Sequence, residues 1–304
     1  MSEHNPIELN YNSASSLRAF LESEGLGMRK KYGQNFLINP NTRQALVNAL
    51  EAEGVQPAAA GEVWEIGPGL GAMTALLLES GYSVRAFEID PGFSQVLKRL
   101  FSAEKGFTLV EGDVMKTWAF QKPAHYLLGN LPYNIAAALL ADFIEKGRIF
   151  NRMVITVQRE VALRMCARAN SPDYSSLSVL CATAYTVKPL MLIRGGSFYP
   201  KPNVDSMGVL LEKRPGAAAC PALFFPLLRS LFGSRRKTVK NNLTGFINSL
   251  LGKESGAAAE GICAMVLAGS GLSGKERAEV LEPEVFLQLA DLLLENLQTE
   301  CKHL

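Results

Sequence analysis

The chain has 304 residues, of which 48% are hydrophobic and 20% charged, proportions typical of a globular protein with a sizeable core. Its net charge of +2 gives no sign of a nucleic-acid partner, so any basic surface must come from local clustering. Five cysteines without a C-x-x-C pair and only three histidines argue against a disulfide framework and against a zinc site. They favour a reducing, cytoplasmic location.

No apolar run approaches the ~18 residues of a membrane-spanning helix, and the polar N-terminus lacks the features of a signal peptide. We therefore expect neither a membrane nor a metal ion as a partner. Residues 1–28 are predicted to form an N-terminal extension with a short helix within 13–26. A further helix is expected to begin at Pro40, with Asn39 as its cap.

From Glu62 onward, short apolar runs alternate with amphipathic segments. The expected strands are 63–66, 83–89, 107–111, 126–129 and 152–158, and the expected helices are 72–80, 92–100 and 135–145. This alternation predicts an α/β fold with a mainly parallel sheet that carries helices on both faces. Sites in such sheets lie at the carboxyl ends of the strands.

The composition changes at residues 213–219, a predicted linker, and strand patterns vanish beyond it. Helical periodicity follows in four segments: 223–232, 238–250, 257–267 and 284–297. We therefore expect three parts: an extension over 1–28, an α/β domain over 29–214, and a small all-helical domain over 215–304.

A glycine-rich loop, Glu65-Ile66-Gly67-Pro68-Gly69-Leu70-Gly71, follows one expected strand and opens a helix. Gly67 and Gly69 let the backbone turn tightly and approach a ligand, and with Ala72 they also satisfy the dinucleotide pattern G-x-G-x-x-A. Glu88 ends the next strand at the spacing of an acid that binds ribose hydroxyls. NAD and S-adenosylmethionine both carry such a ribose.

Two further acids favour S-adenosylmethionine. Glu65 completes an E-x-G-x-G-x-G loop, and Asp113 follows the third strand, where it could accept a hydrogen bond from the adenine amine. A Gly-Asp pair after a strand is more often only a turn. No G-K-[ST] sequence is present, which disfavours a P-loop nucleotide hydrolase.

The tetrapeptide Asn130-Leu131-Pro132-Tyr133 follows the fourth strand. The amine nitrogen of adenine is a poor nucleophile, because its lone pair is delocalised into the ring. The Asn130 side-chain oxygen and the Leu131 carbonyl could accept the two amine hydrogens, with Pro132 fixing the backbone. Tyr133 could stack on one face of the base. The alternative is simply a strand, a proline-containing turn and a helix start.

In this order, these motifs resemble the ribosomal RNA adenine N6,N6-dimethyltransferases, the KsgA family. The match adds Gly33-Gln34-Asn35-Phe36-Leu37, Gln158-Arg159-Glu160-Val161-Ala162, Ser197-Phe198-Tyr199-Pro200-Lys201-Pro202 and Phe232-Gly233-Ser234-Arg235-Arg236-Lys237-Thr238. It covers the chain from about Arg29 to the C-terminus. Asn203, where the family usually has Lys or Arg, and the N-terminal extension depart from the pattern.

The resemblance implies a Rossmann-like methyltransferase domain and S-adenosylmethionine as cofactor. The implied cofactor contacts come from Asn35, Leu37, the Gly67 loop, Glu88 (ribose), Asp113 (adenine) and Asn130 (methyl centre). The implied substrate is a pair of adjacent adenosines in a hairpin loop near the 3′ end of 16S rRNA in the small (30S) ribosomal subunit, with each adenosine methylated twice on N6. The resemblance also implies a role in ribosome biogenesis, and we expect a monomer.

Two sets of residues could contact the RNA. Phe198 is a candidate to stack on the second face of the base, although it could equally be a core aromatic. Arg235, Arg236 and Lys237, with Arg229 and Lys240, could form a helical stripe along phosphates rather than a merely solvated face. A second basic cluster, 29–31, lies near the expected cofactor entrance.

Three alternatives stay open at this point. A large-subunit rRNA methyltransferase of the macrolide-resistance type would share the core and the Asn-x-Pro-Tyr site, but the helical tail favours the small-subunit enzyme. The protein could instead act mainly as a ribosome-assembly factor. An NAD-dependent dehydrogenase fits the glycine loop but has no suitably placed histidine among His4, His125 and His303.

Overall fold

The computed structural model describes residues 9–51, 61–132, 135–217, 220–252 and 256–300. The chain divides into two compact units. The sheet unit comprises 1–142, 148–162 and 187–213, and the helical unit comprises 143–147, 163–186 and 214–304. The domain limits predicted from the sequence stay a prediction.

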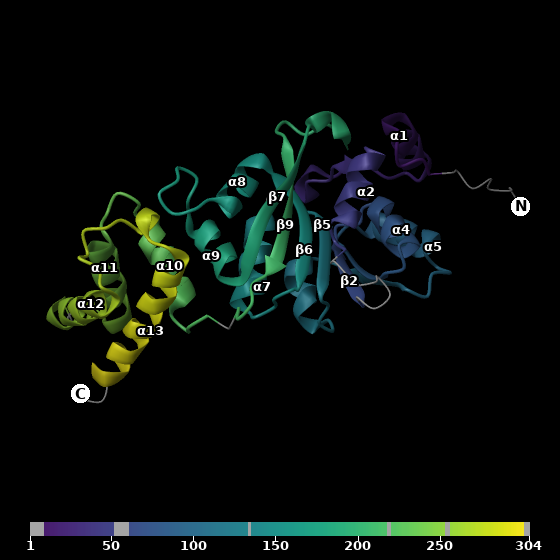
Figure 1. Ribbon diagram of the computed structural model, residues 1–304. Coiled ribbons are helices and arrows are strands. Elements are labelled where there is room, and N and C mark those ends of the chain that lie inside the picture. Colours follow the sequence, from purple (N-terminus) through teal and green to yellow (C-terminus); the bar gives the residue numbers. More distant parts are fainter. Residues whose placement is uncertain (1–8, 52–60, 133–134, 218–219, 253–255, 301–304) are drawn as a thin grey trace, which may run out of the picture. The chain divides into compact units, whose positions relative to one another are not determined.

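Seven of the described strands form one sheet in the order β4-β3-β2-β5-β6-β9-β7 (Figure 1). Four neighbouring pairs are parallel, β2 with β3, β3 with β4, β2 with β5, and β5 with β6, whereas β6 and β9 are antiparallel. The mainly parallel sheet predicted from the sequence is confirmed. The strands are β2 (Glu62–Ile66), β3 (Ser83–Glu88), β4 (Phe107–Glu111), β5 (Tyr126–Asn130), β6 (Arg152–Gln158), β7 (Tyr185–Ile193) and β9 (Ser206–Lys213).

The predicted helices of this unit are present, and their ends lie close to the expected positions: α1 (Ala14–Ser23), α2 (Pro40–Asn48), α4 (Ala72–Glu79), α5 (Pro91–Leu100) and α7 (Ala136–Glu145). Two further helices, α6 (Val114–Thr117) and α8 (Arg159–Cys166), were not predicted. Asn39 caps α2 as predicted, since its side chain accepts a hydrogen bond from the Thr42 N–H at 3.0 Å.

A small two-stranded sheet joins distant parts of the chain. β1 (Phe36–Leu37) pairs antiparallel with β8 (Phe198–Tyr199), which sets Phe36 opposite Tyr199. The sequence did not predict this pairing, because two-residue strands carry no periodic pattern.

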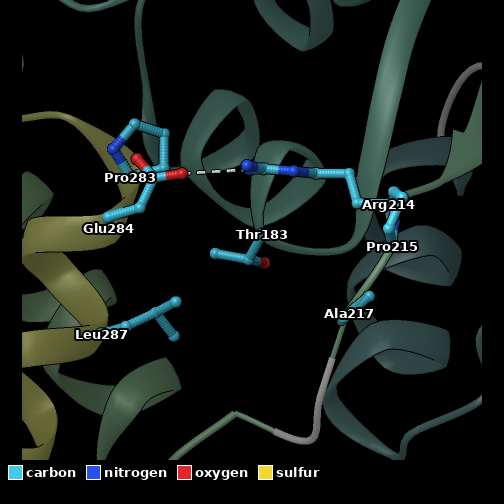
Figure 2. Close-up of a pocket in the computed structure, with 8 residues that line it drawn as sticks. Thr183, Arg214, Pro215, Ala217, Pro283, Glu284 and Leu287 are labelled. Carbon is cyan, nitrogen blue, oxygen red and sulfur yellow. Dashed lines mark hydrogen bonds and ion pairs between the residues drawn. The ribbon is translucent and has the colours of Figure 1, made fainter.

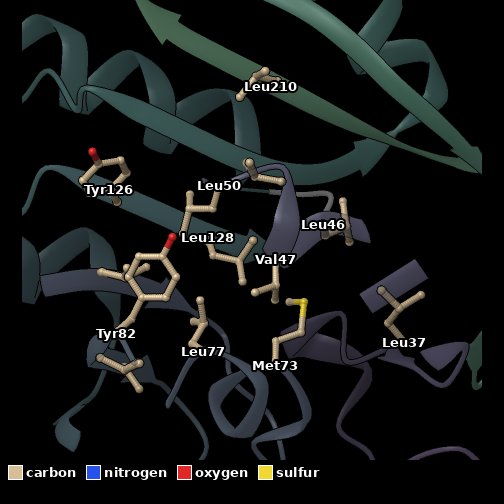
Figure 3. Close-up of a cluster of buried hydrophobic side chains, with 14 of the residues drawn as sticks. Leu37, Leu46, Val47, Leu50, Met73, Leu77, Tyr82, Tyr126, Leu128 and Leu210 are labelled. Carbon is tan, nitrogen blue, oxygen red and sulfur yellow. The ribbon is translucent and has the colours of Figure 1, made fainter. Parts of the chain in front are cut away.

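The core of the sheet unit is packed between helices and strands (Figure 3). Leu46, Val47 and Leu50 belong to α2 or the residues just after it, and Met73 and Leu77 belong to α4. Their side chains meet the strand residues Val63, Val84 and Leu128, and each fully buried aliphatic side chain contributes about 1.5–3 kcal/mol.

The helical unit contains α9 (Ser176–Ala184), α10 (Phe224–Gly233), α11 (Val239–Leu251), α12 (Gly256–Ser270) and α13 (Pro283–Glu300). Phe232 stacks on Phe286 with ring centroids 5.7 Å apart, and the buried Tyr174 hydroxyl donates to the Leu281 carbonyl at 2.7 Å. The four helices predicted after the linker are confirmed. Within the described ranges, no helix is long and apolar enough to cross a membrane.

Candidate active site

The site lies where the strand order of the sheet reverses. The chain passes from β2 to β3 on one side of β2, whereas β5 lies on its other side. Register places Ile66 opposite Gly129, so Gly67 and Asn130 follow at the carboxyl ends of adjacent parallel strands. A reversal of this kind opens a crevice outside the strand ends, which is where ligands bind in open α/β sheets.

A cavity of about 60 Å³ occupies this position. Six predicted site residues line it: Asn35, Gly67, Gly69, Glu88, Asn130 and Pro132. Six further residues that the sequence analysis did not name as site residues complete the lining: Tyr32, Gly33, Gln34, Phe36, Ile89 and Phe93. The sequence held one signal for Ile89: it is an apolar residue between two acids, Glu88 and Asp90, at the end of an expected strand. In the structure its side chain is 39% exposed.

Of the loop glycines that line the cavity, Gly69 most clearly requires glycine. Its φ is +61°, and a Cβ atom there would lie 3.0 Å from a ring carbon of Phe36. A side chain would therefore be strained and would push the Phe36 ring away. The approach of this loop to a ligand stays a prediction.

Glu88 connects this loop to the end of β3. Its Oε2 accepts a hydrogen bond from the Gly69 N–H at 3.1 Å, and its Oε1 accepts one from the Asp90 N–H at 2.8 Å. The carboxyl is only 4% exposed, and burial raises its pKa to about 7 despite these backbone donors. The nearby charge of Asp90 contributes a smaller part of this increase.

Glu65 is a second buried acid beneath the loop. Its Oε2 accepts a hydrogen bond from the Thr74 hydroxyl at 2.6 Å, whereas its Oε1 has no partner among the described residues. Burial, with the nearby charge of Glu88 adding to it, raises the pKa of Glu65 to about 7. Glu65 is fully buried and is not among the residues that line the cavity.

The side chain of Asn130 is held in one orientation. Its Nδ2 donates to the Asn35 carbonyl at 2.8 Å, and its Oδ1 accepts a hydrogen bond from the Thr156 hydroxyl. Because a backbone carbonyl can only accept, the amide nitrogen must face Asn35 and the oxygen must face Thr156. Thr156 is 1% exposed and lies opposite Asn130 in the β5–β6 register. The sequence analysis did not identify it.

Other predicted residues lie elsewhere. Asp113 caps α6 by accepting from the Met115 N–H at 3.0 Å, and it is not among the residues that line the cavity. Leu37 is 5% exposed and packs in the core cluster. The cofactor contacts of both residues stay predictions.

Two aromatic residues were predicted to stack on the base. Phe198 is 3% exposed and belongs to the same core cluster, so the core interpretation fits its position and stacking on a base would require it to leave the core. Tyr133 lies outside the described residues.

A larger cavity of about 620 Å³ adjoins the first and shares Gly33, Gln34 and Asn35 with it. Its lining also includes Arg29, Gln158 at the end of β6, and the 200–204 segment. Lys201 and Asn203 of that segment are exposed, and Arg29 lies 3.6 Å from Asp90. The cavity therefore combines cationic, amide and apolar groups, a lining suited to a nucleotide.

The helical unit holds the predicted RNA-binding residues Arg235, Arg236 and Lys237. They lie in the turn between α10 and α11, so the expected helical stripe is wrong. Thr238 caps α11 immediately afterwards, which ends any continuous helix through the basic run. Arg235 pairs with Glu279 at 3.2 Å, while Arg236 and Lys237 are exposed. Their role in RNA binding stays a prediction.

The helical unit has a cavity of its own, about 160 Å³ in volume (Figure 2). Arg214 Nη1 lies 3.1 Å from a Glu284 carboxylate oxygen and also donates to the Ala182 carbonyl at 2.6 Å. None of the predicted site residues lines this cavity. Arg214 and Glu284 are the charged residues of this lining, and they neutralise each other. The described lining therefore has no unpaired charge with which to bind a charged ligand.

Comparison with known proteins settles the family. The family model described as ribosomal RNA adenine dimethylase matches residues 25–257. This chain belongs to the ribosomal RNA adenine dimethylase family. The family predicted from the ordered motifs is thereby confirmed, and the dehydrogenase alternative is excluded.

Relatives of this dimethylase match almost the whole chain. This chain is 43% identical to a ribosomal RNA small subunit methyltransferase A of Treponema denticola, over 93% of this chain and 96% of the relative. Its identity to the protein of the same name from Shouchella clausii is 33%, over 96% and 99% of the two chains.

Solved structures agree with the fold. A dimethyladenosine transferase from Plasmodium falciparum aligns with a TM-score of 0.72 and 26% identity, over 85% of this chain and 97% of that one. The 23S rRNA methyltransferase ErmE aligns with a TM-score of 0.57 at 22% identity, over 84% and 98%, and shows the same fold. The predicted Rossmann-like methyltransferase fold and enzyme class are confirmed.

The cofactor of this dimethylase is S-adenosylmethionine, and the residues of the site fit it. Glu88 stands at the strand end where a ribose-binding acid belongs, and the glycine loop lets the backbone approach a ligand. Ile89 adds an exposed apolar side chain to the lining, which suits a flat heterocycle such as adenine.

Proposed function

We propose that this protein transfers methyl groups to N6 of two adjacent adenosines in a hairpin loop near the 3′ end of 16S rRNA, dimethylating each one. We further propose that it acts as a monomer on the small (30S) ribosomal subunit in the cytoplasm. The names of the relatives support the small subunit over the large-subunit alternative, because 33–44% identity extends over most of the chain.

The observation that carries this proposal is the fixed Asn130 amide beside the cofactor cavity. Thr156 and Asn35 hold the amide from two sides, so its oxygen stays in one place at the end of β5. An amide oxygen has two lone pairs, and the Thr156 hydroxyl uses one of them. The second lone pair can accept a hydrogen from the adenine amine.

When bound, S-adenosylmethionine supplies a methyl group that is already activated by the positive sulfur. The protein therefore needs no strong base, and its contribution is to position the amine in line with that methyl group. In the proposed mechanism, the Asn130 oxygen and the Leu131 carbonyl accept the two amine hydrogens. These bonds draw the nitrogen towards a tetrahedral geometry and aim its lone pair at the cofactor cavity.

Pro132 lines the same cavity. Its carbonyl accepts hydrogen bonds from the N–H groups of Ile135 and Ala136, which ties Pro132 to the start of α7. We assign Tyr133 to stacking on the adenine. Phe198 is the candidate for the opposite face, and its burial in the core counts against that assignment.

The larger cavity is the proposed place for the extruded nucleotide. A base in a hairpin loop is displaced at a cost of a few kcal/mol, less than a fully paired base requires. Arg29 and the exposed Lys201 would meet its phosphates, and the exposed Arg236 and Lys237 would meet phosphates elsewhere on the RNA. Binding should therefore weaken strongly as salt concentration rises.

A transfer assay with purified ribosomal subunits tests the choice of substrate. We expect labelled methyl groups from S-adenosylmethionine to enter the RNA of 30S subunits taken from cells without this modification. Fully modified 30S subunits and 50S subunits serve as controls and should accept almost none. Preferential labelling of 50S subunits would instead support the large-subunit alternative.

A further inference from the structure

The described part of the N-terminal extension, residues 9–24, lies outside the 25–257 range of the family model. Its helix, α1, begins after Ser13, whose side chain caps it. Leu17, Phe20 and Leu21 of α1 are 1%, 3% and 5% exposed. The segment therefore packs as an integral part of the sheet unit.

The residues that α1 covers belong to walls of the cofactor site. Its apolar cluster contains Leu70 of the glycine loop together with Phe93 and Val96 of α5. Phe93 lines the cofactor cavity, and Phe36, also a lining residue, packs against the same cluster. The Phe36 and Phe93 rings lie 5.6 Å apart. One apolar cluster thus joins the extension to two cavity-lining aromatic residues.

A direct hydrogen bond also connects the extension to the glycine loop. The Tyr11 hydroxyl donates to the Leu70 carbonyl at 2.9 Å. Leu70 follows Gly69, whose N–H is held by Glu88. The loop is therefore fixed on one side by the ribose-binding acid and on the other by the extension. Burial raises the pKa of Tyr11 to about 12, so its hydroxyl remains a donor at physiological pH.

Arg43 ties the same segment to β1. This arginine is 5% exposed, and its Nη1 donates to the Leu37 carbonyl at 2.6 Å and to the Tyr11 carbonyl at 3.3 Å. Its Nη2 donates to the Asn12 side chain. Arg43 therefore links the extension to the strand that carries Phe36 into the cofactor cavity.

A further contact reaches β8. Arg18 Nε donates to the Tyr199 hydroxyl at 3.2 Å, and Tyr199 lies opposite Phe36 in the β1–β8 pair. After α1, Leu26 packs so closely on α5 that a Cβ atom at Gly92 would lie 2.4 Å from a Leu26 methyl carbon. The extension thus contacts the glycine loop, α5 and the β1–β8 pair.

We propose that residues 9–26 form a clamp that holds the walls of the cofactor site in their binding geometry and thereby sets the affinity for S-adenosylmethionine. Tyr11 is its principal positioning residue, because it alone bonds to the glycine loop among the described residues of the extension. The inference rests on the proposed function only in taking S-adenosylmethionine as the cofactor.

Calorimetric titration of the full-length protein with S-adenosylmethionine, without RNA, tests the clamp. Tyr11→Phe deletes one hydrogen bond and keeps the ring, so we expect affinity to fall about 2- to 10-fold. Leu17→Ala, which undermines α1, should weaken binding at least as much. Tyr174→Phe is the matched control: it also deletes one buried hydroxyl's hydrogen bond to a backbone carbonyl, that of Leu281 at 2.7 Å, but it lies in the helical unit and lines no cavity wall of the cofactor site. It should leave the affinity within about twofold.

Two further readouts separate a clamp from a merely structural role. The melting temperature and the KM for RNA are measured on the same variants, and we expect Tyr11→Phe to leave the KM for RNA unchanged. A lower melting temperature with unchanged cofactor affinity in both Tyr11→Phe and Leu17→Ala would overturn the inference. A raised KM for RNA with unchanged cofactor affinity would also overturn it, and would make the extension an RNA contact.

The outcome for the wild-type protein distinguishes this inference from the proposed function. Wild-type protein that binds S-adenosylmethionine, with variants that bind equally well, contradicts the clamp alone. Wild-type protein that fails to bind the cofactor contradicts the proposed function, and the clamp with it.

Discussion

Two sets of polar contacts, one chosen from each unit of this protein, differ in burial. In the sheet unit, Glu65, Glu88 and Thr156 are at most 4% exposed and act through short contacts with the loops that carry the site. In the helical unit, the ion pairs Arg229–Glu145, Arg235–Glu279 and Arg214–Glu284 are at the surface. Buried polar networks respond strongly to a single change, whereas exposed ion pairs contribute about 0–1 kcal/mol each.

From this contrast we expect substitutions at the sheet edge to reduce catalysis strongly and specifically. Substitutions in the helical unit should change RNA binding weakly and in a way that depends on salt. The sheet unit would then perform the chemistry, and the helical unit would add electrostatic attraction for RNA. A strong loss of catalysis from a surface charge of the helical unit, or a weak effect at Asn130, would break the comparison.

The largest effect is expected at Asn130. Asn130→Ala removes the acceptor that orients the amine, so we expect the turnover rate to fall about 10²- to 10³-fold, as when one aligned polar group of an active site is lost. Cofactor affinity should change far less, because Glu88 and the glycine loop remain. Single-turnover methyl transfer and calorimetry measure the two effects. Asn41→Ala, at an exposed residue of α2 that lines neither cavity, is the control, and equal activity of both variants would refute the assignment.

The buried acids predict an unusual pH dependence of stability. Burial raises the folded-state pKa of Glu65 from 4.5 to about 7, so its stabilising contribution is complete below pH 4.5 and is lost as pH rises through 7. The loss is roughly 3 kcal/mol. Glu65→Gln remains neutral, so unfolding of the cofactor-free protein should show wild type losing stability relative to this variant between pH 5 and 8. A constant difference would mean that Glu65 is ionised throughout.

Thr156 should affect catalysis through Asn130. Thr156→Val keeps the shape of the side chain but removes the hydroxyl that orients the Asn130 oxygen, and we expect a fall of about tenfold in kcat. The KM for S-adenosylmethionine should stay close to its wild-type value. Thr156→Ser restores the hydroxyl and should restore most of kcat. Equal loss in the serine and valine variants would indicate a packing effect instead.

Charge reversals in the helical unit should have the smallest effect on function for each charge that is changed. Arg235→Glu combined with Arg236→Glu should weaken RNA binding about tenfold at low salt and flatten the dependence of affinity on salt concentration. The turnover rate at saturating RNA should persist. Lys98→Glu with Arg99→Glu, two adjacent basic residues of α5 in exposed ion pairs, supplies the matched charge change. Equal RNA affinity of the two double variants would mean that the turn after α10 is not part of the RNA-binding surface.

The fold was predictable wherever the signal was local. Asn39 and Pro40 mark the start of α2 within a few residues of sequence, and the four helices after the linker follow from periodicity. The β1–β8 pair was not predictable, because it joins residues about 160 positions apart through strands of only two residues.

The residues of the candidate site also fall into those that the local sequence predicts and those that it does not. Gly67, Glu88 and Asn130 could be predicted because each directly follows or ends a strand. Thr156 could not, since only the register between β5 and β6 brings it to Asn130. Nor could the burial of Phe198 or the attachment of Tyr11 to Leu70, because both depend on packing between distant segments.

Position-resolved mass spectrometry of 16S rRNA tests the central claim most directly. Unmodified 30S subunits are incubated with the protein and S-adenosylmethionine, and the RNA is digested and sequenced by mass. The account predicts N6,N6-dimethyladenosine at two adjacent positions of a hairpin loop near the 3′ end, and none with Asn130→Ala. Methyl groups on another atom or nucleotide, or dimethylation that survives Asn130→Ala, would contradict it.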